Sequence, residues 1–483
     1  MSRSLNRLAI GLLILMVALL VQLTRIQVLQ AEELNAMPGN QRTLLTEYSR
    51  QRGPILVDSA PIARSVATDG SLRYLREYPA GPQFASATGF YSIVFGATGL
   101  ERTENEVLSG EDPRLFVDRM QQLFAGRDVV GGSVTTTLNA QAQLAAWNGL
   151  SGKTGSVVAI EPDTGRILAQ VQSPSFDPGL LSTHDSKEVN DYYAELEADE
   201  DKPLLNRPLA KTNPPGSTFK VVTAAAALES GRFTPDSVLP GPATYTLPGT
   251  DVELPNWTGQ ACGPGGSDEV TLAEALAISC NTAFAWLGVE LGDDALRDQA
   301  EAFGFEESFE TPQKAAASRF PADPDESQTA QSAIGQFDVR ATTLQMAMVV
   351  AAIGNQGTTM RPGIVDEISA PDLSPLETFR PQDFADAMSP EHAAELTDMM
   401  VGVVQTGTGS SARIPGVQVA GKTGTAQTSK DRPSIAWFVA FAPAANPEVA
   451  VAVAVEDAGT NEVSGNQLAG PIAREVMRAV LAS

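Results

Sequence analysis

The sequence predicts an α+β protein built from three parts: a single N-terminal membrane anchor, a small mixed α/β module, and a large domain whose mainly antiparallel five-stranded sheet lies between helical layers. Three observations lead to this prediction. A long apolar run stands at the N-terminus, two strand patterns precede a mostly helical middle, and three more strand patterns and a final helix close the chain. We expect the three parts to be residues 1–30, 31–138 and 139–483.

The first part is an apolar segment with a basic flank. Arg3 and Arg7 precede Leu8–Leu23, sixteen residues without a charge. Such a run is either a secretory signal or a somewhat short membrane-spanning helix. No convincing small-x-small cleavage site follows it, so we favour an uncleaved, single-pass anchor in the cell membrane. The basic flank then lies in the cytoplasm, and the remainder of the chain is extracellular.

Composition narrows the function classes. The chain has 483 residues and 43% hydrophobic content, enough for two or three domains and at least one large core. Its formal charge of −25 argues against nucleic acid or an anionic membrane surface as the main partner. The two histidines, His184 and His392, leave little material for a Ser-His-Asp triad or a histidine-rich metal site. We therefore expect no metal and no other cofactor.

The second part, residues 31–138, mixes short strand-like and helical runs without a constellation of catalytic side chains. Gln51–Asp58 reads as a turn leading into a strand, and Gly99–Gly110 is bounded by glycines. A domain of about a hundred residues with a polar surface is typical of a spacer or docking module. We expect this part to be a non-catalytic pedestal.

The third part begins with an amphipathic helix and a β-hairpin and ends with three strands and a helix. The turn residues Pro162–Gly165 separate the two hairpin strands. The late strands are short apolar runs joined by short loops. The expected elements, in chain order, are a helix at 141–150, strands at 156–161, 166–171, 417–420, 434–441 and 449–455, and a helix at 471–481.

The central helix of this domain begins at a stiff turn, Pro214–Gly216, and is small or apolar on nearly every side. Ser217 stands at its start, and Lys220 follows one turn later on the same face. One interpretation makes Ser217 an N-cap and Lys220 a solvated first-turn residue. The chemical interpretation is that burial lowers the pKa of Lys220, so that its neutral amine can accept the proton of the Ser217 hydroxyl.

A second motif stands where the helical pattern at 270–278 stops. Ser279 and Asn281 suit, respectively, proton transfer to a leaving amine and binding of a substrate amide. The alternative is an ordinary polar helix end. A second S-x-N, at Ser464–Asn466, shows that the pattern also arises by accident.

A third motif, K-T-G-T, continues one of the late strands. Lys422, Thr423 and Thr425 offer a cation and two hydroxyls to a carboxylate, and Gly424 allows a substrate backbone to approach. The other K-T-G, at Lys153–Gly155, lies before the first hairpin strand, and we interpret it as a decoy.

The two cysteines are eighteen positions apart, at Cys262 and Cys280. The expected extracellular location favours a disulfide between them. Two buried, reduced thiols are the alternative.

The ordered set S-x-x-K, S-x-N and K-T-G is the signature of penicillin-binding proteins and class A β-lactamases. The chain resembles the class B penicillin-binding proteins, and most closely the actinobacterial penicillin-binding protein A group, over essentially its whole length. Cys280 departs from the aspartate of the better-known Ser-Asp-Asn form, at a position that varies among such enzymes. The segments that carry the resemblance are Pro214–Lys220, Gly421–Gln427, Ala436–Pro443, Arg52–Ile55 and Gly99–Gly110.

The resemblance implies the penicilloyl-serine transferase fold and a peptidoglycan D,D-transpeptidase that cross-links stem peptides during division or growth of the cell wall. It implies that Ser217 attacks the penultimate D-alanine, that Lys220 is the general base, and that the backbone N–H groups of Ser217 and Thr425 form the oxyanion hole. Ser279 then helps to protonate the departing D-alanine, and β-lactams acylate Ser217 and leave slowly. The implied substrate-binding residues are Asn281, Lys422, Thr423, Gly424 and Thr425.

Three alternatives share this chemistry. A class A β-lactamase supplies a glutamate base in an E-x-x-L-N segment, and Thr282–Phe303 contains Glu290 and Glu301 but no such segment. A D,D-carboxypeptidase lets water resolve the acyl-enzyme, and the large N-terminal module argues against it. A β-lactam sensor, which binds without turnover, needs a cytoplasmic signalling part, and only about seven residues precede the apolar run.

The resemblance also implies partners. The N-terminal module is too short for a glycosyltransferase domain, so we expect a separate glycan polymerase, and the family pairs with multi-span SEDS-type polymerases of the divisome or elongasome. We expect residues 31–135 and the anchor to make this contact. Stem peptides ending in D-Ala-D-Ala and β-lactams are the expected ligands, and nucleic acid is not expected.

Overall fold

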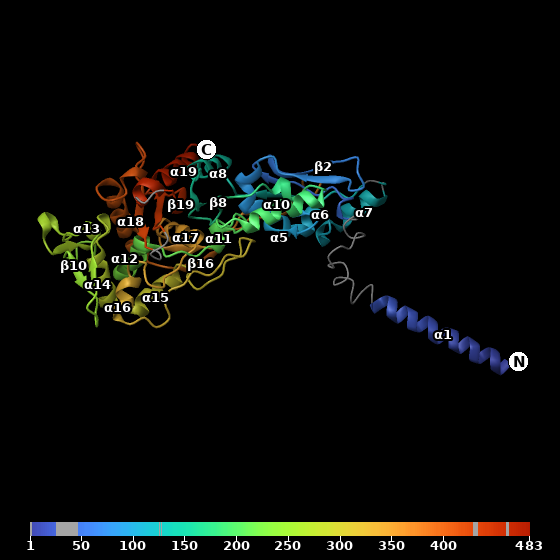
Figure 1. Ribbon diagram of the computed structural model, residues 1–483, viewed down its shortest axis with the longest axis horizontal. Helices are drawn as coiled ribbons and strands as arrows, with labels where there is room; N and C mark the ends of the chain where they lie inside the picture. Colours follow the sequence, from blue (N-terminus) through green and yellow to red (C-terminus); the bar gives the residue numbers. More distant parts are fainter. Residues whose placement is uncertain (1, 26–46, 125, 127, 428–432, 460–462) are drawn as a thin grey trace.

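The computed structural model describes residues 2–25, 47–124, 126, 128–427, 433–459 and 463–483. It contains an N-terminal helix, a module of mixed sheet and short helices, and a larger domain around a five-stranded sheet (Figure 1). This is the predicted α+β organisation. The predicted boundary between anchor and module, at residues 30 and 31, lies outside the described residues.

The N-terminal helix, α1 (Ser2–Thr24), has the length and composition of a membrane span. Its window Arg7–Thr24 has a mean hydropathy of 2.2, and none of it is buried against the rest of the protein. Among the residues that the structure describes, no other helix combines this length with this apolarity. The helix is consistent with a single-pass anchor or with a signal segment.

The five-stranded sheet of the large domain is antiparallel throughout, in the order β17-β18-β19-β7-β8. Four strands match the prediction within a few residues. The predicted strand at 417–420 is displaced, because the strand begins only at Ala420. The K-T-G-T motif, predicted to continue that strand, lies inside it. The strands are β7 (Thr154–Ile160), β8 (Ile167–Ser173), β17 (Ala420–Ala426), β18 (Ile435–Ala442) and β19 (Val449–Asp457).

Strand β19 shows why helices cover both faces of this sheet. Its valines and alanines alternate, so the valines share one face and the alanines the other. The valine face joins the apolar cluster that contains α8 (Ala140–Gly149) and α19 (Gly470–Leu481). The alanine face joins the cluster that contains α17 (Thr343–Gly354), because small side chains let a helix approach closely. The predicted helices at 141–150 and 471–481 are thereby confirmed.

A group of helices in the large domain packs around one central helix. The central one, α12, is buried along almost its whole length, as its apolar sequence predicts. The helices are α12 (Lys220–Glu229), α13 (Leu272–Ala277), α14 (Asn281–Leu291), α15 (Asp293–Ala302), α16 (Glu326–Ser332) and α18 (Pro390–Gln405). Short strand pairs lie beside them: β9 (Val238–Pro240) with β12 (Glu269–Thr271), β10 (Thr244–Thr246) with β11 (Glu253–Pro255), and β13 (Thr358–Met360) with β16 (Asp383–Asp386).

The N-terminal module is built around a six-stranded sheet to which distant parts of the chain contribute. Its strands are β1 (Ile55–Val57), β2 (Ala60–Ala67), β3 (Tyr74–Glu77), β6 (Ser133–Thr136), β14 (Val365–Ser369) and β15 (Pro375–Thr378). The order is β15-β14-β6-β1-β2-β3. Two strands that follow residue 138 by more than two hundred positions therefore complete this sheet, which joins the module to the large domain through backbone hydrogen bonds.

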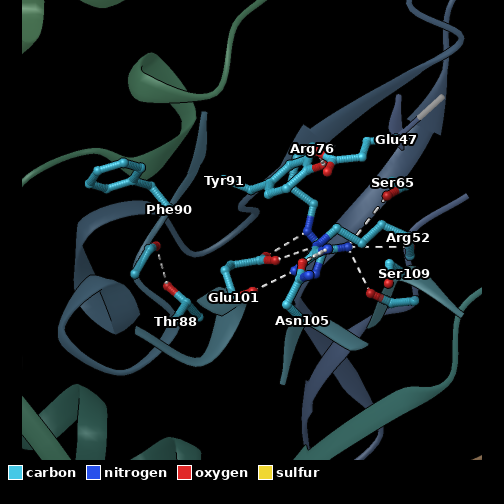
Figure 2. Close-up of polar contacts among 12 residues, drawn as sticks. Glu47, Arg52, Ser65, Arg76, Thr88, Phe90, Tyr91, Glu101, Asn105 and Ser109 are labelled. Atoms are coloured by element: carbon cyan, nitrogen blue, oxygen red, sulfur yellow. Dashed lines mark hydrogen bonds and ion pairs between the residues drawn. The ribbon is translucent and has the colours of Figure 1, made fainter. Parts of the chain in front are cut away.

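A buried ion cluster ties together the two N-terminal segments singled out in the sequence (Figure 2). The Glu101 carboxylate has no exposed surface and accepts hydrogen bonds from Arg52 Nε at 2.7 Å, Arg76 Nε at 2.6 Å and the Tyr78 hydroxyl at 3.2 Å. Burial by itself raises the pKa of Glu101, but the guanidinium groups of Arg76 and Arg52 outweigh it and hold that pKa below its usual range. Arg52 also donates to Asn105 Oδ1 at 2.7 Å.

Two short helices of the module contribute Glu101 and Asn105 to this cluster. Glu101 belongs to α5 (Gly99–Thr103), and Asn105 begins α6 (Asn105–Ser109). A further amphipathic helix, α7 (Phe116–Phe124), follows at the end of the module away from the five-stranded sheet (Figure 1).

Candidate active site

Ser217 lies in a single 3₁₀ turn, Gly216–Phe219, directly before α12. Gly216 has a φ of 54°, and a Cβ on it would lie 2.9 Å from the carbonyl oxygen of Thr425, so glycine is required on both counts. The turn is held by two further contacts. Gly216 N donates to the carbonyl of Gly335 at 2.9 Å, and Trp437 Nε1 donates to the carbonyl of Pro214 at 3.0 Å. The Ser217 turn is thus pressed against strands β17 and β18.

Lys220 begins α12 and has no exposed surface. Its Nζ donates to the carbonyl of Ser279 and to Asn281 Oδ1, both at 2.8 Å, and lies 3.4 Å from Ser279 Oγ. The ring of Phe284 closes another side, with its centroid 5.6 Å from Nζ. The interpretation of Lys220 as a solvated first-turn residue is wrong, because the side chain is fully enclosed.

Burial lowers the pKa values of two lysines in this site. Desolvation, followed by repulsion from Lys422, puts the pKa of Lys220 well below its ordinary value. Desolvation also lowers the pKa of Lys422 to about 7. A lowered pKa favours the neutral amine, and a neutral amine can accept a proton.

Ser279 lies between α13 and α14 in the left-handed region, with a φ of 62°. A non-glycine residue in this region is uncommon and indicates that its surroundings hold it there. Asn256 supplies part of that support: its Oδ1 accepts hydrogen bonds from the backbone N–H of Asn281 at 3.0 Å and of Thr282 at 3.1 Å. These bonds satisfy the first donors of α14.

The K-T-G-T motif lies inside β17, an edge strand of the sheet. Lys422 has no exposed surface, and its Nζ donates to Ser279 Oγ and to the carbonyl of Thr423, both at 2.9 Å. The Thr423 hydroxyl is 2.7 Å from that of Thr408, which in turn lies 3.4 Å from the carbonyl of Ala277 at the end of α13. Strand β17 is therefore linked to the C-terminal end of α13 in two ways, through Lys422 and Ser279 and through Thr423 and Thr408.

The space beside Gly424 is filled by the protein itself. A Cβ at this position would lie 2.9 Å from Thr218 Cγ2 and 3.1 Å from the carbonyl oxygen of Pro215. From the sequence, a substrate backbone is expected to approach here. The structure instead places the Ser217 turn against the glycine, so its small size serves the packing of that turn onto β17.

The structure thus brings together all three motifs. A chain of hydrogen bonds runs from Lys220 through Ser279 to Lys422. Its second bond joins Ser279 and Lys422, which are 143 positions apart in the sequence. Ser217 is half-buried in the turn that precedes Lys220, and its hydroxyl forms no hydrogen bond to another residue within the described ranges. Thr425 is likewise half-buried, next to Gly216.

The side chains of the two look-alike motifs make other hydrogen bonds, although the second motif lies close to β17: a Cβ on Gly465 would lie 2.5 Å from the carbonyl oxygen of Gly424. Lys153 donates to the carbonyl of Gly149, and its strand β7 is separated from β17 by β18 and β19. Asn466 uses its side chain to accept from the backbone N–H of Ser411 at 3.0 Å.

Cys262 and Cys280 form a disulfide, with an S–S distance of 2.08 Å. Because Cys280 stands between Ser279 and Asn281, this bond ties the S-x-N segment to the loop that carries Asn256. Sequence reasoning missed Asn256 and Thr408. No motif surrounds either residue, and only their contacts reveal them.

Comparison with known proteins gives the same assignment for the whole chain. Residues 155–478 match the model of the penicillin-binding protein transpeptidase domain, and residues 52–134 match that of the penicillin-binding protein A dimerisation domain. The peptidoglycan D,D-transpeptidase PbpA of Mycolicibacterium smegmatis is 47% identical over 491 residues, which cover 100% of this chain and 99% of the relative.

Solved structures of penicillin-binding protein A from M. tuberculosis are also similar. Two of them, acyl-enzyme complexes with ceftriaxone and with penicillin G, are 44% identical to this chain, with TM-scores of 0.88 and 0.85. Each comparison covers 90% of this chain and 100% of the solved chain.

Proposed function

This chain belongs to the penicillin-binding protein A family of peptidoglycan D,D-transpeptidases, and from this premise we propose that Ser217 is the nucleophile that forms the acyl-enzyme. The observation that carries the proposal is the hydrogen-bonded chain Lys220–Ser279–Lys422. This chain begins at the lysine that follows Ser217 by one helical turn. It contains two lysines with lowered pKa values and a bridging hydroxyl. Proton transfer needs this combination of groups.

In the acylation step, Ser217 Oγ attacks the carbonyl carbon of the penultimate D-alanine of a stem peptide. Neutral Lys220 takes the hydroxyl proton, and the new ester bond forms as the peptide bond to the terminal D-alanine breaks. The proton moves from Lys220 to the departing amine through Ser279, whose Oγ lies within reach of both lysines. An amine of a neighbouring stem peptide then attacks the ester and releases Ser217.

Two backbone N–H groups, of Ser217 and Thr425, stabilise the negative charge on the carbonyl oxygen during each attack. The contact between Gly216 and Thr425 supports this pairing, because it holds the Ser217 turn against the strand that carries the second donor. A side chain at position 216 would separate the two.

The terminal carboxylate of the substrate binds at β17. Thr423 and Thr425 supply hydroxyl donors. Lys422 Nζ lies behind them, bonded to Ser279 Oγ, and the bound carboxylate favours the protonated form of this otherwise neutral amine. Asn281 holds the substrate amide while its Oδ1 accepts from Lys220. Gly424 contributes by letting the Ser217 turn approach the strand. β-Lactams enter the same site, acylate Ser217 and leave slowly.

We further propose that α1 anchors the chain in the cell membrane, with its basic end in the cytoplasm and residues 31–138 and 139–483 outside. The Cys262–Cys280 disulfide suits an oxidising, extracellular location. Residues 31–135 and α1 contact a SEDS-type glycan polymerase. The test replaces α1 by an unrelated membrane-spanning helix. If the protein keeps its activity in cells, α1 does not contribute to the contact with the polymerase.

The test of the nucleophile is intact mass spectrometry of the detergent-solubilised full chain with benzylpenicillin, followed over hours. Wild type is compared with Ser217→Ala and with Ser464→Ala, the matched serine of the look-alike motif. We expect a long-lived adduct in wild type and Ser464→Ala and none in Ser217→Ala. An adduct on Ser217→Ala refutes Ser217 as the nucleophile. Rapid hydrolysis of benzylpenicillin without a persistent adduct indicates that the protein is a β-lactamase.

A further inference from the structure

Helix α7 presents its apolar side to solvent. Phe116, Val117 and Phe124 are 53%, 63% and 85% exposed, and with 3.6 residues per turn they lie on one side of the helix. A surface helix normally buries its apolar side and exposes its polar one. An outward-facing apolar side therefore indicates a surface that something else covers.

The polar residues of α7 make the contacts with the rest of the module. Gln122 Oε1 accepts a hydrogen bond from the backbone N–H of Val130 at 3.0 Å, and an Arg119 Nη donates to the carbonyl of Gly110 at 3.4 Å. Leu115, one position before the helix, is buried on that same side. These contacts fix the rotation of α7, so the outward orientation of its phenylalanines follows from how the helix is docked.

Helix α7 stands beside the point at which the chain arrives from α1. Arg50 pairs with Glu111 just before the helix, and the backbone N–H of Gln51 donates to the carbonyl of Val129 just after it, at 3.3 Å. The helix also lies at the end of the module farthest from the five-stranded sheet (Figure 1). Residues 26–46 connect this point to α1, and a chain of that length reaches at most about 75 Å.

The charge around α7 is balanced, although the whole chain carries −25. Three carboxylates that flank the helix have guanidinium partners, and α7 itself carries one charge of each sign, Asp118 and Arg119, which removes most of the repulsion from an anionic surface. The pairs are Arg50–Glu111, Arg114–Asp112 and Arg73–Asp128.

We propose that the apolar side of α7 lies on the outer surface of the lipid bilayer that α1 spans. The inference rests on the proposed anchoring role of α1. A short helix with exposed phenylalanines and flanking arginines has the composition of an interfacial helix. The patch is a few side chains on one helix, which is little surface for a stable protein interface. Lipid requires no shape complementarity, and the tether keeps the effective concentration of membrane high enough for a weak contact to persist.

The contact gives the N-terminal module a second attachment to the membrane. With two attachments, the module cannot rotate freely about the connecting segment. The height and orientation of the active site above the bilayer are then set by the protein itself.

The test measures lipid contact at α7 in the full chain reconstituted into phosphatidylcholine–phosphatidylglycerol vesicles. Because the native cysteines form a disulfide, Val117→Cys introduces a single thiol for an environment-sensitive fluorophore. We expect a blue-shifted emission that falls at least twofold when lipids spin-labelled near the headgroup are included. The same fluorophore on Ala322→Cys, an exposed position in the large domain, is expected to show neither change.

A second set of variants separates lipid contact from other causes. Adding Phe116→Ser and Phe124→Ser to Val117→Cys abolishes the quenching, whereas the matched leucine substitutions retain it. All of these proteins keep wild-type acylation by benzylpenicillin, because the substituted side chains are largely exposed and outside the active site.

Four outcomes overturn the inference. A blue shift seen only in native membranes indicates a protein partner, and one that depends on protein concentration without lipid quenching indicates a second copy of the chain. Failure of the full chain to float with the vesicles refutes the anchor together with the α7 contact. Flotation without quenching refutes the α7 contact alone and leaves the proposed function standing.

Discussion

Lys422 places an amino group inside β17 without exposed surface, and we predict that Lys422→Met changes how stability depends on pH. Burial lowers the pKa of Lys422 from 10.5 to about 7 in the folded protein. Between these two values the unfolded chain binds a proton that the folded chain does not. The stability of the wild type therefore rises with pH across this window, and it no longer changes for this reason below pH 7, where both states are protonated.

The magnitude follows from the size of the shift. One proton corresponds to about 1.4 kcal/mol per pH unit, so the whole window is worth roughly 4–5 kcal/mol. The variant also loses the hydrogen bonds from Lys422 to Ser279 and Thr423, at about 1–3 kcal/mol each. The loss of these hydrogen bonds lowers the unfolding free energy of Lys422→Met by a nearly constant amount at every pH. It therefore does not change how the difference between wild type and variant depends on pH.

The assay is urea unfolding at four pH values from 7 to 10, monitored by tryptophan fluorescence, for wild type, Lys422→Met and Lys314→Met. We expect the unfolding free energy of the wild type, minus that of Lys422→Met, to increase by about 1.4 kcal/mol per pH unit. The exposed Lys314 serves as the control, and its variant is expected to run parallel to wild type. Parallel curves for wild type and Lys422→Met refute the assignment of a neutral Lys422 in the folded protein.

Three further predictions concern the base, the disulfide and the ion cluster. Lys220→Arg keeps a cation but abolishes acylation, since guanidinium cannot accept a proton, and near-normal penicillin labelling contradicts the base assignment. Reduction of Cys262–Cys280 lowers the melting temperature, with about 3 kcal/mol lost for a loop of this size, and an unchanged melting curve after confirmed reduction argues against it. Glu101→Gln strands two buried guanidinium groups and costs roughly 3–5 kcal/mol in urea unfolding, whereas the exposed Glu106→Gln stays within about 0.5 kcal/mol; equal effects of the two refute the cluster's role.

Local patterns in the sequence predict much of the fold. The apolar sequence of α12 predicts burial, and the alternation in β19 predicts a strand, because both depend on which side chains recur along one element. The order of the three motifs predicts the chemistry of the site, because reactive side chains carry their properties with them. The strand at 417–420 is placed too early, since lysine and glycine in the motif weaken the strand pattern that continues to Ala426.

Other features depend on contacts between distant segments. Pairing of β14 with β6 joins residues separated by more than two hundred positions, and no local pattern specifies that partner. The same holds for Asn256, whose role is visible only once the backbone N–H groups of Asn281 and Thr282 point at it.

The sequence by itself determined that this protein has a serine and a lysine one turn apart at the start of an apolar helix, an S-x-N segment and a K-T-G strand, because residue type and spacing specify which chemistry is available. Only the tertiary structure decided that Lys422 bonds to Ser279, that Gly424 receives the Ser217 turn and that α7 faces outward. Hydrogen bonds and close packing act over about 3–4 Å, so partners distant along the chain are chosen by how helices and strands pack and not by the residues that precede or follow them.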